Sequence, residues 1–202
     1  MDLYRIENDL RDRGFKNVLG TDEAGRGPMA GPLVAAAVIL PPGLVIPGLN
    51  DSKKLSPKKR EELYDLIASV AVEVQTEVIP VEEIDRINVL EASKKAMRAC
   101  IEKMRTPVDY VLADAVELEL DLPMLGIIKG DAKAAAIAAA SIIAKVTRDR
   151  LMVSYDEIYP EFGFKKHKGY VTKHHLEMLA KHGPCPLHRR SFAPVRLYFE
   201  ND

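Results

Sequence analysis

Four acidic residues lie at points of the chain where their side chains could act together. Asp22 and Glu23 end an expected strand before a glycine-rich turn, Asp114 ends another expected strand, and Asp131 follows a short apolar segment. Converging carboxylates repel one another, and a bound Mg²⁺ or Mn²⁺ offsets the repulsion because hard cations prefer oxygen ligands. Two such ions can activate water and stabilise the leaving oxygen of a phosphodiester. The four acids therefore predict a divalent-metal nuclease site, although a cap or a solvated turn would also explain Asp131 alone.

The glycine-rich turn after the first two acids has two rival interpretations as a nucleotide site. Residues 20–27 nearly match a phosphate-binding P-loop, but Arg26 replaces the lysine and Gly27 replaces the hydroxyl residue. The spacing of Gly25, Gly27 and Gly31 also misses the dinucleotide fingerprint by one residue. What remains is a Gly-Arg-Gly turn that lets backbone approach a ligand closely, or a simple tight turn.

The bulk charge does not by itself indicate a nucleic-acid-binding protein. The chain has 202 residues, 47% of them hydrophobic, and a formal net charge of −1, which suits one domain or one domain with a small appendage. The basic residues are nevertheless clustered at Lys53-Lys54 with Lys58-Lys59-Arg60, at Lys165-Lys166-His167-Lys168, and at His188-Arg189-Arg190. A solvated surface and a phosphate-binding groove account for these clusters about equally well.

The elements that must position these residues alternate between strands and helices. Apolar runs and period-two patterns predict strands at residues 18–23, 33–40, 72–79, 109–113 and 124–128. Helical periodicity and capping signals predict helices at residues 1–13, 56–70, 89–105, 132–159 and 172–181. Leu90, Met97 and Ile101 are expected to face inward on the third of these helices, and Asp131 to cap the fourth. The order predicts an α/β fold with part of the sheet parallel, in which sites collect at strand ends.

Several further polar residues could have either a structural role or a role in binding substrate or metal. Ser141, Lys145 and Arg148 form one stripe on an otherwise apolar helix; we favour a structural role for them, with phosphate contact by Lys145 as the less favoured view. His167 is equally compatible with loop structure and substrate contact. The segment from His182 to His188 offers only three potential zinc ligands and two prolines, so we do not expect a zinc site there.

The remaining sequence features concern the cellular compartment of the protein and its possible partners. Cys100 and Cys185 match no paired spacing and are expected to be reduced thiols. The N-terminus lacks the apolar run of a signal peptide, and residues 134–144 are too short an uncharged run to cross a bilayer, which takes about 20 residues. We expect a cytoplasmic monomer without membrane contact. The apolar–aromatic end at residues 196–200 could dock a partner such as a replication clamp or pack onto the body.

Seven blocks, in order along most of the chain, form a more specific pattern. They are Asp22–Pro28, Asp51–Ser56, Leu112–Asp114, Lys129–Val146, Gly163–Phe164, His167–Tyr170 and His188–Phe192. Together they resemble the ribonuclease HII family, the type 2 ribonucleases H. The sister type, ribonuclease HIII, carries a large additional N-terminal domain and a Glu as its fourth acid. About twenty residues precede Asp22 and the fourth acid is Asp131, so both features favour type HII.

The resemblance implies a fold, an activity and a set of site residues. The implied fold is a ribonuclease H-like mixed sheet flanked by helices, with a catalytic core at residues 1–160 and a helical C-terminal extension at 161–202 that contributes to substrate binding. The implied enzyme cuts the RNA strand of RNA–DNA hybrids and nicks 5′ of single ribonucleotides embedded in DNA, leaving a 3′-hydroxyl and a 5′-phosphate. Such an enzyme would serve ribonucleotide removal and RNA-primer processing during replication and repair.

The family's functional residues map onto this chain one by one. Its four catalytic and metal-binding acids match Asp22, Glu23, Asp114 and Asp131, with Mn²⁺ or Mg²⁺ as the expected cofactor. Its substrate-binding residues match a turn that senses the 2′-hydroxyl, a lysine that binds phosphate and a tyrosine that packs on the sugar at the RNA–DNA junction: Gly25, Arg26, Gly27, Lys53 and Tyr170. Ala115 follows the third acid where glycine is more usual. A P-loop-like nucleotide hydrolase and a non-catalytic nucleic-acid-binding module are the alternatives from other classes.

Overall fold

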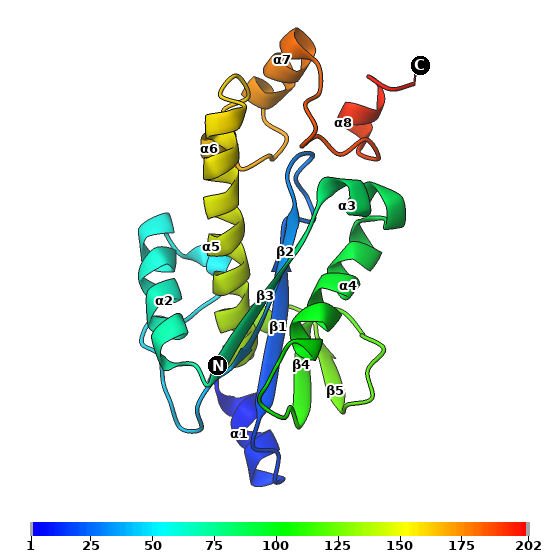
Figure 1. Cartoon of the computed structure of the whole chain (residues 1–202). Helices are drawn as coiled ribbons and strands as arrows, with labels where there is room; N and C mark the ends of the chain where they lie inside the picture. Colours follow the sequence, from blue (N-terminus) through cyan, green and yellow to red (C-terminus); the bar gives the residue numbers. More distant parts are fainter. Residues whose placement is uncertain (1, 201–202) are drawn as a thin grey trace.

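A computed structural model, which describes residues 2–200, contains a five-stranded mixed sheet between two layers of helices (Figure 1). The strands are β1 (Val18–Ala24), β2 (Leu33–Ile39), β3 (Glu73–Ile79), β4 (Tyr110–Asp114) and β5 (Met124–Ile127), in the order β3-β2-β1-β4-β5. Strands β1, β2 and β3 pair antiparallel, whereas β1 pairs with β4, and β4 with β5, in parallel. The expected mixed sheet of an α/β fold is confirmed.

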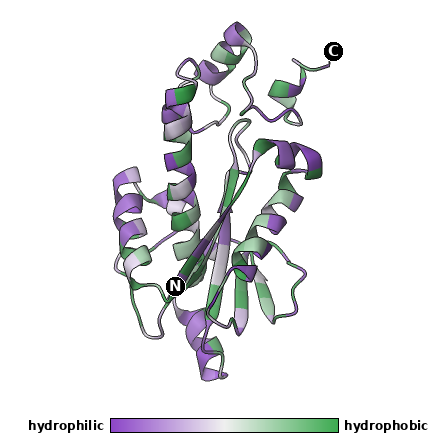
Figure 2. Ribbon diagram, viewed as in Figure 1, coloured by the Kyte–Doolittle hydropathy of each residue, from purple (hydrophilic) through white to green (hydrophobic). Residues whose placement is uncertain are grey.

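The helices divide between the two faces of the sheet and one end of it. They are α1 (Arg5–Asp12), α2 (Pro57–Val70), α3 (Val81–Ile87), α4 (Val89–Glu102), α5 (Ala135–Ile158), α6 (Phe164–His167), α7 (Lys173–His182) and α8 (Ala193–Arg196), with 3₁₀ turns η1 (Ser52–Lys54) and η2 (Gly130–Ala132). One core packs α4 against β2 and β1, and a second packs α5 and α2 against the opposite face. Figure 2 shows hydrophobic residues along the central strands and hydrophilic ones over much of α1 and α2. No helix within residues 2–200 is long and apolar enough to span a membrane.

Helix α5 lies directly on β1 because both elements are built from small residues where they cross. Gly20 of β1 faces the first turn of α5, where a Cβ on this glycine would lie 2.1 Å from the carbonyl carbon of Ala136. The alanines of α5 bury this contact completely. The spacing between this helix and the sheet therefore depends on Gly20.

We expect Gly20→Ala to lower the free energy of unfolding by about 3 kcal/mol, because the clash is with backbone that cannot rotate away. Urea denaturation monitored by circular dichroism measures the change. Gly43→Ala is the matched control: it has a positive φ of 74° but nothing within 4 Å of the added Cβ, so it should cost only about 1 kcal/mol. Equal losses in the two variants would contradict this account of the contact.

Two sequence-based expectations about helices are wrong. Asp131 does not cap α5: it lies in η2, and Ala134 occupies the N-cap without a side-chain bond. The buried Glu7 of α1 replaces it, since its carboxylate accepts the backbone N–H of Ala136 at 2.7 Å. Leu90 is 40% exposed, because the buried face of α4 begins at Ala92. Met97 and Ile101 face inward as expected.

The C-terminal region is helical in part. After α5 ends, α6 and α8 are single turns and only α7 is longer, at 10 residues. This region lies at one end of the sheet, beyond the end of α5 (Figure 1). Met1 and residues 201 and 202, which belong to the expected first helix and to the expected extension, lie outside the described residues. Cys100 and Cys185 are both unpaired in the structure.

Candidate active site

The topology of the sheet brings the four acids to one place. In the parallel pair of β1 and β4, Thr21 lies opposite Ala113, so Asp22 and Asp114 leave neighbouring strands at the same end. Strand β5 pairs with β4 up to Asp114 and then leads into η2, which carries Asp131. The backbone N–H of Gly130 donates to Oδ1 of Asp114 at 2.6 Å, which fixes η2 beside β4.

Asp22 and Glu23 approach this place from opposite faces of the sheet, as strand alternation requires. Asp22 lies against Ser141 of α5, and Glu23 lies against Ser93 of α4. Arg26 is 3.5 Å from Oε1 of Glu23. The other carboxylate oxygen of Glu23, Oε2, is buried and, beyond the approach of Ser93, has no hydrogen-bond partner among the described residues.

The acids hold more negative charge than their neighbours neutralise. Burial, then the charges of Glu23 and Asp114, raises the pKa of Asp22 well above its ordinary value. Burial also raises the pKa of Glu23 and that of Asp131. The cations close to the acids are Arg26 beside Glu23 and Lys53, whose Nζ is 3.5 Å from Oδ2 of Asp131. A further cation would therefore be bound favourably and would displace protons.

This set of donors fits a hard divalent ion. The ligands are carboxylate oxygens, and one of them is buried without a partner. Within residues 2–200, no group of three or more Asp, Glu, His or Cys side chains lies close enough together to hold a metal ion without other ligands. An open set suits Mg²⁺ or Mn²⁺, because such ions keep several waters and bind through a few carboxylates plus substrate phosphate.

An open pocket of about 340 Å³ collects nearly all of the sequence-predicted site residues. Its walls include eight of the nine: Asp22, Glu23, Gly25, Arg26, Gly27, Lys53, Asp114 and Tyr170. Asp131 lies behind Lys53 and does not line the pocket. Ser52, Ser141 and Lys145 also line it. The sequence drew attention to Ser141 and Lys145 because they are polar residues at helical spacing on an apolar helix. Ser52 stood out only as a member of the block Asp51–Ser56.

Two buried guanidinium groups hold the turn that forms one wall of the pocket. Arg189 donates to the carbonyl oxygens of Gly25 at 2.6 Å, Gly31 at 2.8 Å and Arg26 at 3.3 Å. Arg148 donates to those of Pro32 at 2.9 Å, Ala30 at 3.1 Å and Lys168 at 2.9 Å. Both side chains are completely buried. Arg189, grouped with surface cations from its sequence, is therefore a structural residue, and Arg148 has the structural role expected of the stripe.

Tyr170 reaches the pocket from a second loop, residues 167–170, which packs against the first. The backbone N–H of Met29 donates to the carbonyl oxygen of Gly169 at 3.0 Å, and a Cβ on Gly169 would lie 2.2 Å from the carbonyl oxygen of Ala30. The ring of Tyr170 is 45% exposed and faces Gly27, where an added Cβ would lie 3.6 Å from Cε1 of the tyrosine.

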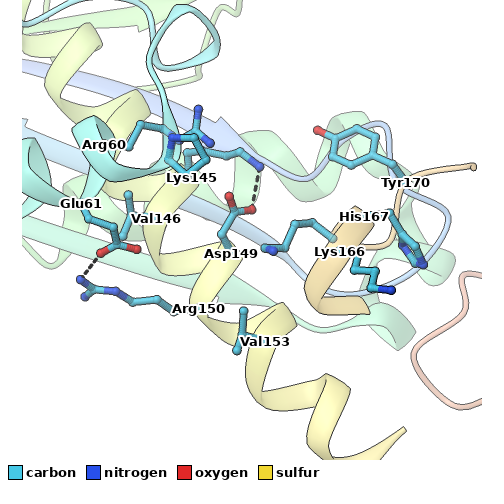
Figure 3. Close-up of a pocket in the computed structure, with 12 residues that line it drawn as sticks. Arg60, Glu61, Lys145, Val146, Asp149, Arg150, Val153, Lys166, His167 and Tyr170 are labelled. Atoms are coloured by element: carbon cyan, nitrogen blue, oxygen red, sulfur yellow. Dashed lines mark hydrogen bonds and ion pairs between the residues drawn. The ribbon is translucent and has the colours of Figure 1, made fainter. Parts of the chain in front are cut away.

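A second cavity of about 510 Å³ adjoins the first and shares Lys145 and Tyr170 with it (Figure 3). We call it the basic groove; its walls are Pro57, Arg60, Glu61, Lys145, Val146, Asp149, Arg150, Val153, Lys166, His167, Lys168 and Tyr170. Lys145 pairs with Asp149 at 2.6 Å, and Arg150 pairs with Glu61. Arg60, Lys166 and Lys168 make no ion pair within the described residues, so the groove carries an excess of positive charge.

Comparison with known proteins identifies the family. The sequence model of the ribonuclease HII family matches residues 19–195. The ribonuclease HII of Bacillus licheniformis is 55% identical over 196 residues, which cover 97% of this chain and 77% of that protein. This chain belongs to the ribonuclease HII family. It is accordingly a ribonuclease H, an endonuclease of a family that depends on divalent metal ions.

Solved structures agree with the family assignment. The ribonuclease H2 of Pyrococcus horikoshii is 29% identical, with a TM-score of 0.77 over 92% of this chain and 98% of that one. A ribonuclease HII of Archaeoglobus fulgidus, solved in complex with PCNA, is 27% identical, with a TM-score of 0.72 over 87% of this chain and 95% of that one. The recognised family and the ribonuclease H-like fold are therefore confirmed, and membership of a ribonuclease family removes the nucleotide-hydrolase and non-catalytic alternatives.

Proposed function

We propose that this ribonuclease HII cuts at ribonucleotides through two divalent ions held by Asp22, Glu23, Asp114 and Asp131. The observation that carries the proposal is the convergence of Asp22, Glu23 and Asp114 in one pocket whose other walls are Gly25–Gly27 and Tyr170. The bound ions supply an activated water and charge stabilisation at the leaving oxygen. The carboxylates hold the ions, and the hydrolysis leaves a 3′-hydroxyl and a 5′-phosphate.

The turn beside the acids supports recognition of the 2′-hydroxyl. The carbonyl oxygens of Gly25 and Arg26 are occupied by Arg189, which fixes the turn before substrate arrives. Gly27 has no side chain to keep a sugar away, and Tyr170 lies across from it. A ribose lying against both would meet a rigid backbone that can test for the hydroxyl distinguishing RNA from DNA. We therefore assign RNA–DNA hybrids and single ribonucleotides embedded in DNA as substrates, with the nick on the 5′ side of the ribonucleotide.

Lys53 and the basic groove are suited to phosphates. The side chain of Lys53 is 78% exposed, and its Nζ lies 3.5 Å from Asp131, so it can contact a phosphate next to the acids. The groove shares Lys145 and Tyr170 with the acidic pocket and has a volume of about 510 Å³; Figure 3 shows the residues that line it. We assign this groove, which the C-terminal region at residues 161–202 helps to form, to the strand that is not cut.

We expect Lys166→Gln combined with Lys168→Gln to weaken hybrid binding by about tenfold near 0.15 M salt. The loss should be similar for all sequences, and the slope of log K against log salt should fall by roughly one to two, because phosphate contacts release counterions. Fluorescence anisotropy over a salt series measures both quantities. Lys94→Gln with Arg98→Gln removes the same charge from α4, away from the groove, and should leave affinity unchanged. An equal loss in that control would exclude a specific role for the groove.

The remaining aspects of the proposal concern the setting of the activity. We assign Mn²⁺ or Mg²⁺ as the cofactor, a cytoplasmic monomer as the working form, and ribonucleotide removal and RNA-primer processing as its role. The A. fulgidus protein was solved in complex with PCNA. We assign no residue of this chain to a contact with a replication clamp.

Cleavage of a labelled RNA–DNA hybrid in Mg²⁺, in Mn²⁺ and in EDTA tests the proposed function. We expect cleavage of the RNA strand with either ion, none in EDTA, and none of an RNA–RNA duplex of the same sequence. Efficient cleavage in EDTA would refute the metal assignment, and equal cleavage of both duplexes would refute the substrate assignment.

A further inference from the structure

Two buried histidines near the backbone of Tyr170, His175 and His188, take no part in the function proposed so far. All five histidines of the chain lie between residues 167 and 188. His175 and His188 are completely buried, among Phe162 and Phe164. Buried imidazoles need hydrogen-bond partners, so the bonds of these two rings determine where their protons lie.

The hydrogen bonds of His188 and His175 form one directed chain. The backbone N–H of Cys185 donates to Nδ1 of His188 at 3.0 Å, so the proton of neutral His188 is on Nε2. That Nε2 lies 3.1 Å from Nε2 of His175, which must then be the acceptor. The proton of His175 is therefore on Nδ1, and it is donated to the carbonyl oxygen of Tyr170 at 2.9 Å. We call this chain, from Cys185 to Tyr170, the histidine relay.

The relay requires both rings to be neutral, and the surroundings keep them so. Burial lowers the pKa of His175 and that of His188 to about 4. A second proton on His175 would place two N–H groups against each other between the two Nε2 atoms, and a second proton on His188 would place its Nδ1–H against the N–H of Cys185. His167 stacks on His175 with ring centroids 4.3 Å apart and accepts the backbone N–H of Gly169 at its Nδ1.

Within the loop that carries Tyr170, each carbonyl oxygen has its own buried donor. Arg148 holds that of Lys168, the N–H of Met29 holds that of Gly169, and His175 holds that of Tyr170. The tyrosine ring itself is exposed, and its hydroxyl makes no hydrogen bond within the described residues. Apart from Lys145, whose Nζ lies 5.9 Å from the ring centroid, the ring is held through its backbone, and the hydrogen bond nearest to the ring on that backbone is the one from His175 to the carbonyl oxygen of Tyr170.

We propose that His175 and His188 are positioning residues that hold Tyr170 at the pocket in the orientation in which it packs on the substrate sugar. This inference rests on the role given to Tyr170 in the proposed function. It adds that a specific pair of tautomers, and not simply a filled core, sets the efficiency of cleavage at a single ribonucleotide.

Steady-state cleavage of a DNA duplex with one ribonucleotide tests the proposal with a matched set of variants. His175→Phe keeps the ring shape and removes both nitrogens, and we expect kcat/KM to fall about tenfold. His175→Asn places an amide N–H two bonds from Cβ, as Nδ1 is in histidine, and should recover most of the loss. His174→Phe, on the exposed side of the same helix, should leave kcat/KM unchanged.

Combining the same variants with Tyr170→Ala distinguishes an effect of His175 on the position of the Tyr170 ring from a general effect on the structure. We expect Tyr170→Ala to lower kcat/KM and His175→Phe to add nothing to that loss, since the ring it positions is gone. If the two losses multiply, the positioning proposal is wrong while the role of Tyr170 stands. If Tyr170→Ala has wild-type activity, the role of Tyr170 is wrong and the positioning proposal falls with it.

Nitrogen-15 NMR of the wild-type histidine rings keeps the proposal testable even if His175→Phe does not fold. At pH 7 we expect neutral rings, with the proton of His175 on Nδ1 and that of His188 on Nε2. A proton on Nε2 of His175, or a doubly protonated ring at either position, would overturn the relay.

Discussion

Asp114→Asn should reduce cleavage of an RNA–DNA hybrid by roughly a thousandfold or more while the fold survives. The substitution keeps the shape of the side chain, and its amide oxygen can still accept the N–H of Gly130, which now donates to Oδ1 at 2.6 Å. It removes one negative charge from the acids that would hold the cation. Because the charge of Asp114 raises the pKa of Asp22, its removal should also relieve repulsion in the metal-free protein.

Three measurements separate loss of chemistry from loss of fold. Single-turnover cleavage should show the large decrease, the thermal midpoint should equal or exceed that of the wild type, and hybrid binding in Ca²⁺ should persist. Asp121→Asn, at an exposed position in the loop between β4 and β5, removes the same charge away from the site and should be fully active. Wild-type cleavage by Asp114→Asn would show that Asp114 is not part of the catalytic site.

Arg189→Met should lower the free energy of unfolding by about 3–5 kcal/mol. The guanidinium group donates to the carbonyl oxygens of Gly25, Gly31 and Arg26, and methionine would leave those of Gly25 and Gly31 buried without this donor. Burial lowers the pKa of Arg189 only to about 9, so the group is charged at pH 7 and each bond is charge-assisted. The turn at Gly25–Gly27 should lose its fixed shape, and cleavage should fall even where the variant stays folded.

Arg190→Met is the matched control for this prediction, because Arg190 is the next residue and is exposed. Urea denaturation should show little change for Arg190→Met and a large one for Arg189→Met. Activity should be measured at a temperature at which both variants are folded by circular dichroism. If Arg189→Met is as stable and active as Arg190→Met, the turn is held by other contacts and Arg189 has no role in holding it.

The sequence predicted the sheet and most of the site because their signals are local. The acids at the ends of β1 and β4, the capping residue Ser56 before α2, and the alanine pattern of α5 are each set by neighbours along the chain. Parallel pairing of β1 with β4 then brings Asp22 and Asp114 together without further information. Recognition of the family added Tyr170, which no local pattern would have placed at the pocket.

Contacts between residues far apart in the chain were not predictable in this way. Asp131 looked like a cap for α5 from its position, but Glu7, 129 residues away from Ala136, supplies that bond. Arg189 and His188 lie in a basic cluster for which a solvated surface was one interpretation, yet both are buried. Arg189 bonds to the carbonyl oxygen of Gly25, 164 residues away, and His188 bonds to the ring of His175 in α7. Such residues can be recognised only when the structure shows which unpaired groups they meet.

Mapping the cut in a DNA duplex that carries one ribonucleotide tests the central claim most directly. The proposed arrangement, in which the acids hold the metal ions beside a turn that senses the 2′-hydroxyl, predicts a single nick on the 5′ side of the ribonucleotide in Mg²⁺ or Mn²⁺. One fragment should carry a 3′-hydroxyl and the other a 5′-phosphate. The all-DNA duplex of the same sequence should remain intact. A nick on the 3′ side of the ribonucleotide, or cleavage of the all-DNA duplex at a similar rate, would contradict the account.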